Sequence, residues 1–145
     1  MNMKYLIFVL VVVLLLISGF DFKYDPTYTV NITVYTHGTH KLWSYSLNNE
    51  IVKVIKYSTN NEKPKTLLDR KLTKAEQKEI DKIMKKFPLK KMKTRYENKL
   101  VEGEIHSIYK ININGLEKEI YVYFYKEKNL DKLMVMILKL MANKN

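Results

Sequence analysis

The chain has 145 residues, no cysteine, and 26 Lys and Arg residues against 15 Asp and Glu residues, which gives a formal charge of +11. The lack of cysteine excludes a disulfide scaffold, a Cys-ligated zinc site and a thiolate nucleophile. Four glycines and three histidines form neither a glycine-rich phosphate loop nor a His-rich metal centre, so the sequence predicts no cofactor.

The first twenty residues are predicted to form a membrane-targeting helix. Lys4 and the amino terminus precede twelve uninterrupted apolar residues at 6–17, which is the layout of a signal peptide or an uncleaved signal anchor. As a helix, the apolar stretch of residues 5–20 would be about 24 Å long, somewhat less than the ~30 Å hydrocarbon core. Its amino-terminal flank is positive and its carboxy-terminal flank is acidic. The positive-inside rule therefore places residues 21–145 outside the cytoplasm, either held at the cell membrane or secreted.

The end of the apolar run resembles the bacterial lipoprotein signal. Ile17, Ser18 and Gly19 match the aliphatic residue and the small pair that precede the invariant cysteine of that signal, but Phe20 occupies the cysteine position. The resemblance covers some twenty residues and implies export without lipid attachment. Gly19 and Ile17 satisfy only half of the small-residue requirement of signal peptidase. We therefore place an uncleaved anchor slightly ahead of secretion.

Residues 21–145 are predicted to form one α+β domain, in which two helices cover one face of a mainly antiparallel sheet of about five or six strands. The expected element order is ββ(β)(β)αββα. Alternating apolar and polar residues predict the first strands, at 28–35, 42–47, 51–57 and 66–68. Thr73 and Glu76 form a capping box at the start of an amphipathic helix that Pro88 ends.

Asn114-Gly115 predicts a type I′ turn between two strands. With this turn, the residue numbers of each opposed pair sum to 229. Lys110 then faces Glu119 on one face of the hairpin, and apolar residues face one another on the opposite face. The apolar pairs are Ile113–Leu116, Tyr109–Ile120 and Ile105–Phe124. From Asn129 onward, apolar residues recur at helical spacing and predict a second helix.

Three tyrosines on the last predicted strand are candidate binding residues. Tyr121, Tyr123 and Tyr125 alternate with Ile120, Val122 and Phe124, so they are expected on the face opposite the buried one. Aromatic side chains on an open face can stack on sugar rings or bases, or dock a protein partner. The structural alternative is that tyrosine is simply a favoured strand residue, or that a second layer or the membrane surface covers this face.

Positive charge is concentrated in residues 63–99, which hold 14 Lys and Arg residues and 5 Asp and Glu residues. Such a surface attracts anionic lipid or an anionic envelope polymer. A solvated lysine surface produced by A+T-rich coding explains the same composition, since arginine occurs only twice. The scarcity of arginine and the export signal argue against nucleic acid as a partner. The candidate binding lysines are Lys78, Lys82, Lys85, Lys86, Lys90 and Lys91.

The sequence favours a non-catalytic binding or inhibitor-type module of unknown ligand. His37, His40 and His106 are interpreted as solvated or structural residues, so no metal site is expected. The alternatives are an enzyme of unrecognised class that uses the loop of Glu102 and Glu104, and a structural component of an envelope complex. A pocket that gathers His106, Glu102 and Glu104 would favour the enzyme, whereas an exposed tyrosine face would favour binding.

Overall fold

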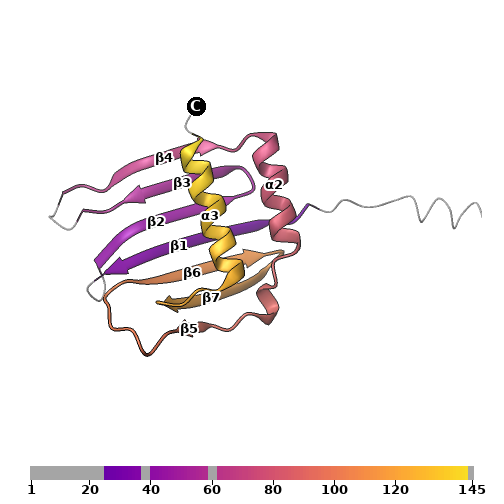
Figure 1. Cartoon of the computed structure of the whole chain (residues 1–145). Helices are drawn as coiled ribbons and strands as arrows, with labels where there is room; N and C mark the ends of the chain where they lie inside the picture. The colour runs from indigo at the N-terminus through magenta and orange to yellow at the C-terminus, as the bar shows by residue number, and fades with distance from the viewer. Residues whose placement is uncertain (1–24, 37–39, 59–61, 144–145) are drawn as a thin grey trace, which may run out of the picture.

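The structure, a computed structural model, describes residues 25–36, 40–58 and 62–143 (Figure 1). It is a mixed α+β fold in which helices α2 (Lys74–Lys85) and α3 (Lys128–Ala142) lie across one face of a seven-stranded, mostly antiparallel sheet. The strand order is β4-β3-β2-β1-β6-β7-β5. The strands are β1 (Tyr28–Thr36), β2 (His40–Asn48), β3 (Ile51–Lys56), β4 (Lys65–Lys71), β5 (Arg95–Glu97), β6 (His106–Ile113) and β7 (Leu116–Tyr123). The predicted α+β class is confirmed, while the predicted amino-terminal helix lies outside the described residues.

Strand β1 lies in the middle of the sheet, between β2 and β6. Val30 and Ile32 are fully buried, and Ile32 is in register with Tyr45 on β2 and with Tyr109 on β6. Because side chains alternate between the two faces of a strand, these residues form an apolar row on the helix-covered face. The period-two pattern that predicted this strand therefore marks the centre of the core.

The predicted hairpin is confirmed at its turn. Asn114 and Gly115 have φ values of 52° and 84°, as a type I′ turn requires, and the Lys110 Nζ lies 3.0 Å from a carboxylate oxygen of Glu119. The ladder ends at the pair His106 and Tyr123. The predicted pair Ile105–Phe124 is wrong, because Phe124 turns to φ 44° and both side chains are exposed.

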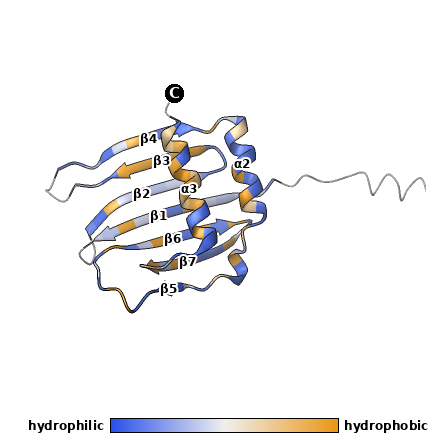
Figure 2. Ribbon diagram, in the orientation of Figure 1, coloured by the Kyte–Doolittle hydropathy of each residue, from blue (hydrophilic) through white to orange (hydrophobic). Residues whose placement is uncertain are grey.

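Both helices begin at side-chain caps. In the predicted capping box, the Glu76 amide donates to the Thr73 hydroxyl (3.2 Å) and the Thr73 amide donates to the Glu76 carboxylate (2.8 Å). At α3, the Glu127 carboxylate accepts hydrogen bonds from the Asn129 and Leu130 amides. The two helices carry hydrophobic residues on one side and hydrophilic residues on another (Figure 2). The buried sides present Ile80 and Met84 from α2, and Leu130, Leu133, Met136, Ile137 and Leu140 from α3.

The sequence missed one strand. Strand β5 follows α2 and a single 3₁₀ turn, η1 (Leu89–Lys91), and it pairs in parallel with β7. It has only three residues, Arg95, Tyr96 and Glu97, too few to show a period-two pattern. The expected count of five or six strands is therefore wrong, and the observed order is ββββαβββα.

Candidate functional site

The predicted binding lysines are all exposed on or just after α2, and with their exposed lysine neighbours we call them the lysine face. It consists of the exposed residues Lys74, Lys78, Lys82, Lys85, Lys86, Lys90, Lys91 and Lys93. Helix α2 turns Ile80 and Met84 toward the sheet, so its lysines project from the remaining sides. After Pro88, the turn η1 buries Leu89 and exposes Lys90 and Lys91. The local alternation of buried and exposed residues thus leaves all six predicted lysines exposed.

The lysine face contacts the point at which the folded domain begins. The Lys85 Nζ lies 3.0 Å from the Asp25 carboxylate, and Asp25 is the first residue that the structure describes. Figure 1 shows the chain entering β1 beside the carboxy-terminal end of α2. The segment that precedes residue 25 is therefore joined to the domain at the edge of the lysine face.

Two carboxylates lie within this positively charged surface. Asp25 and Asp81 line an open depression of about 470 Å³, together with Lys74, Gln77, Lys78, Lys82 and Lys85. Burial raises the pKa of Asp81, and the negative charge of Asp25 raises it further, while Lys85 partly opposes the shift. Burial and the charge of Asp81 also raise the pKa of the Tyr28 hydroxyl. Asp81 is thus a half-buried carboxylate beside a like charge, where ionisation is unfavourable.

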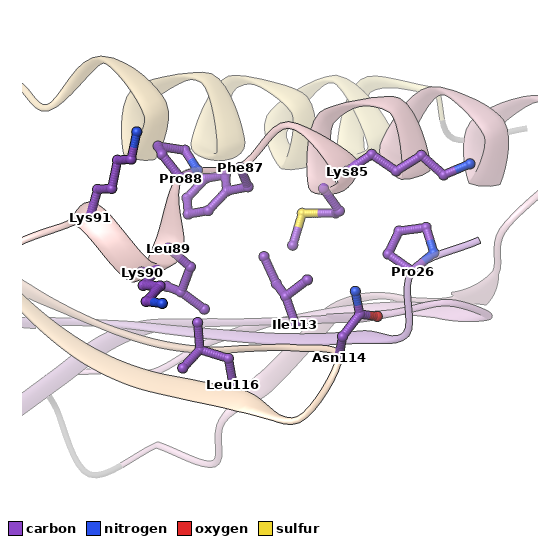
Figure 3. Close-up of a pocket in the computed structure, with 11 residues that line it drawn as sticks. Pro26, Lys85, Phe87, Pro88, Leu89, Lys90, Lys91, Ile113, Asn114 and Leu116 are labelled. Atoms are coloured by element: carbon purple, nitrogen blue, oxygen red, sulfur yellow. The ribbon is translucent and has the colours of Figure 1, made fainter. Parts of the chain in front are cut away.

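A second hollow, of about 540 Å³, lies between the end of α2, η1 and the β6–β7 turn (Figure 3). We call it the α2–hairpin groove. Its surface is mainly apolar, and none of the described residues that line it is acidic. Leu116 is 44% exposed, which leaves an apolar side chain open to solvent in the groove. The lining residues are Pro26, Met84, Lys85, Phe87, Pro88, Leu89, Lys90, Lys91, Ile113, Asn114 and Leu116.

The three lysines of the groove differ in their partners. Lys85 is paired with Asp25, whereas Lys90 and Lys91 form no ion pair within the described part of the chain. Lys118 on β7 donates from its Nζ to the carbonyls of Lys90 (3.2 Å) and Met92 (2.7 Å), which fastens the η1 segment to the hairpin. Lys90 and Lys91 therefore provide the uncompensated positive charge at one end of the groove.

The three predicted tyrosines do not form one stripe. Tyr121 and Tyr123 are half-buried on β7, but the strand ends at Tyr123 and the positive φ of Phe124 breaks the alternation before Tyr125. Tyr125 packs against Tyr96, with ring centroids 5.5 Å apart. The Tyr123 hydroxyl accepts a hydrogen bond from the Gly103 amide and donates one to the Gly103 carbonyl (3.0 and 2.8 Å). Tyr123 therefore holds the loop that precedes β6.

Tyr121 belongs to a stack that the sequence did not reveal. Its ring lies 5.2 Å from that of His106, which in turn stacks on Tyr35 at 5.1 Å. The Arg95 guanidinium lies over Tyr121 at 4.5 Å from the ring centroid, a favourable cation–π geometry. These residues come from four strands. The juxtaposition depends on the pairing of β1, β6, β7 and β5 and has no local signal in the sequence.

The residues of the enzyme alternative do not meet in one pocket. A hollow of about 270 Å³ is lined by His106, Tyr109 and Phe124 among others, but neither Glu102 nor Glu104 lines it. Within the described ranges, no three His, Asp or Glu residues are grouped so that they could hold a metal ion. His37 lies outside those ranges. This hollow therefore does not bring His106 together with Glu102 and Glu104.

No protein-family model matches this sequence, and no curated protein matches it. Among the described residues, neither helix has the length and apolar character needed to cross a membrane.

Proposed function

We propose that this protein is a membrane-tethered, extracytoplasmic binding module without catalytic activity. In this proposal residues 1–20 anchor the chain and residues 21–145 lie outside the cytoplasm, with the lysine face against anionic lipid headgroups. The observation that carries the proposal is the ion pair between Lys85 and Asp25. Through this pair the lysine face contacts residue 25, where the described part of the domain begins.

The length of the connection supports this arrangement. Position 25 is five residues further along the chain than position 20, and an extended chain spans at most ~3.6 Å per residue. Asp25 is therefore at most about 18 Å from the end of the apolar segment, and Lys85 touches Asp25. The attraction between exposed charges extends over about 10 Å at 0.1 M salt. A tether of this length therefore allows the lysine face to approach the membrane surface to within this electrostatic range.

The charge of the surface supports anionic lipid as the partner. A basic residue near a negatively charged membrane contributes about 1 kcal/mol to binding. The lysine face has eight exposed lysines. Some of this charge is compensated, because Asp25 pairs with Lys85. Lys78 and Lys82 form no ion pair among the described residues.

The test is co-sedimentation of the fragment 21–145 with lipid vesicles, after circular dichroism has verified that the fragment is folded. This fragment contains the whole buried core, from Tyr28 to Leu140. We expect binding to phosphatidylglycerol vesicles at 0.1 M salt, little binding to phosphatidylcholine vesicles, and release at 1 M salt, where the Debye length is ~3 Å. The proposal would be contradicted by equal binding to both lipids at both salt concentrations, or by no binding to anionic vesicles.

A pair of charge-reversal variants tests the location of the binding surface. Lys78→Glu/Lys82→Glu changes the lysine face, whereas Lys63→Glu/Lys65→Glu makes the same charge change at exposed positions before and at the start of β4. We expect only the first variant to lose binding to anionic vesicles. Equal losses in both variants would mean that net charge alone attracts the domain.

Topology is tested with the full chain. A carboxy-terminal alkaline phosphatase fusion should be active, because the positive-inside rule places residue 145 outside the cytoplasm. An inactive phosphatase fusion together with a fluorescent cytoplasmic reporter at the same position would overturn the proposed localisation.

A further inference from the structure

We propose that the α2–hairpin groove binds a single-chain anionic amphiphile of the fatty-acid type, taken up from the adjacent membrane. The inference rests on the proposed function, because it requires the groove to lie near a lipid surface. It goes further by assigning a chemical class of ligand to one defined site, and by separating that site from the rest of the lysine face.

The interior of the groove is suited to an acyl chain. Phe87, Ile113 and Leu116 present partly exposed apolar side chains to the groove (Figure 3), whereas the lining residues Met84 and Leu89 are buried. Leu116 is 44% exposed, so a bound chain would remove apolar surface from water, which is the main driving force for binding such ligands. The volume of about 540 Å³ falls within the ~300–1,000 Å³ of small-molecule sites. One chain fits this space better than the two chains of a phospholipid.

The charge around the groove selects an anionic headgroup. Lys90 and Lys91 lie at one end of the groove, while Pro26 and Asn114 lie at the other (Figure 3). Lys85 already forms an ion pair with Asp25. Lys90 and Lys91 are therefore the lining lysines that can pair with the carboxylate of a ligand. None of the described lining residues is acidic. We infer that the headgroup lies at the Lys90 and Lys91 end and that the chain extends past Ile113 toward Pro26.

The position of the groove supplies the source of the ligand. Pro26 is part of its lining, and Pro26 is six residues further along the chain than position 20, where the apolar amino-terminal segment ends. At ~3.6 Å per residue, this connection allows at most about 22 Å between the groove and that segment. A ligand that leaves the bilayer therefore has a short path to the groove.

The experiment uses the full chain reconstituted in phosphatidylcholine vesicles. The probe is a hexadecanoic acid that carries a photoreactive diazirine and an alkyne, and the labelled peptides are identified by mass spectrometry after irradiation. Label on residues 1–24 reports the bilayer itself and is disregarded. We expect the remaining label to concentrate on peptides that contain residues 84–91 and 113–116, and the uncharged methyl ester of the probe to label them about tenfold less.

Two variants and two matched controls separate the groove from its surroundings. Lys90→Glu/Lys91→Glu and Leu116→Ser should each lower the labelling of these peptides about tenfold, through lost charge pairing and lost apolar contact. Lys63→Glu/Lys65→Glu makes the same charge change before and at the start of β4, outside both the groove and the lysine face. Leu138→Ser removes a leucine that is 46% exposed on α3. Both controls should retain labelling, and thermal unfolding verifies that each variant is folded.

Three results would overturn the groove as a lipid site. They are label spread over the whole domain, label that is unchanged in both groove variants, and equal losses in the groove variants and their controls. None of these results affects the vesicle binding of the fragment 21–145, which tests the proposed function separately. If fragment binding fails while the label maps to the groove, the lipid site holds and the electrostatic membrane contact does not.

Discussion

Arg70 and Glu76 form a bidentate ion pair that joins strand β4 to both helices. The Arg70 Nη1 and Nη2 atoms donate to the two Glu76 carboxylate oxygens at 2.9 and 2.7 Å, and Nη2 also donates to the Leu140 carbonyl of α3 at 3.2 Å. Glu76 is at the same time the acidic member of the α2 capping box. The Glu76 carboxylate therefore caps α2 and holds β4, while the Arg70 guanidinium links that strand to α3.

The substitution Glu76→Gln should lower the free energy of unfolding by about 1.5–3 kcal/mol, because it weakens charge-assisted hydrogen bonds at a largely buried site. The control is Glu79→Gln. Glu79 pairs with Lys139 at 2.9 Å, but both side chains are more than half exposed, so the expected loss is below about 1 kcal/mol. Urea unfolding measures both values, and equal losses would show that the buried pair adds nothing beyond a surface contact.

The same pair predicts a pH dependence of stability. The hydrogen bonds from Arg70 lower the pKa of Glu76 from 4.5 to about 2 in the folded protein. The stabilisation is therefore complete above the ordinary pKa of about 4.5 and is lost as the pH falls toward 2. We expect the stability difference between the wild-type protein and Glu76→Gln to shrink over this interval. A difference that is constant from pH 7 to pH 2 would contradict the assigned shift.

The hairpin turn predicts a backbone effect at Gly115. Its φ of 84° is unfavourable for a β-branched residue, although an added Cβ would meet no atom within 4 Å. Gly115→Val should therefore cost about 1–3 kcal/mol through backbone strain alone. Gly115→Asn should cost less, because asparagine tolerates positive φ. Thermal unfolding of the two variants checks this order, and an unchanged melting temperature for Gly115→Val would refute it.

Removing the charge of Asp81 should stabilise the protein at neutral pH. The pKa of Asp81 is raised by burial and by Asp25, so the folded state favours the protonated carboxyl group. Its contribution to stability is present below the ordinary pKa of 3.8 and is lost as the pH rises through the raised value. Asp81→Asn should thus unfold at higher urea than the wild-type protein at pH 7, and the advantage should disappear below about pH 4. A variant that is less stable at pH 7 would show that the attraction of Lys85 dominates.

Features with a short-range cause were predictable from the sequence. The capping box of Thr73 and Glu76 needs only residues three positions apart. The Asn114-Gly115 turn sets the register of Lys110 and Glu119 because a two-residue loop fixes the pairing of its strands. The exposure of the lysines on α2 follows from the helical spacing of Ile80 and Met84.

Features that depend on distant pairing were not predictable in this way. Strand β5 is held by the parallel partner β7, whose residue Tyr121 lies far from Arg95 in the sequence. The hairpin ladder ends where Phe124 takes a positive φ. No pattern of residues in the sequence predicts this backbone conformation. The α2–hairpin groove combines Pro26, Leu89 and Leu116, which come together only when α2, η1 and the hairpin pack.

The central position of β1 also determines how the domain would respond to mechanical force. A pull on residue 25 is transmitted along β1, which is hydrogen-bonded to β2 on one side and to β6 on the other. Inter-strand hydrogen bonds run perpendicular to the strands, so this force loads both ladders in shear. Extraction of β1 would break the two ladders together and expose Val30 and Ile32, whereas an edge strand such as β4 can be peeled from one neighbour. A pull on the amino-terminal end of the domain is therefore opposed by two hydrogen-bonded ladders at once.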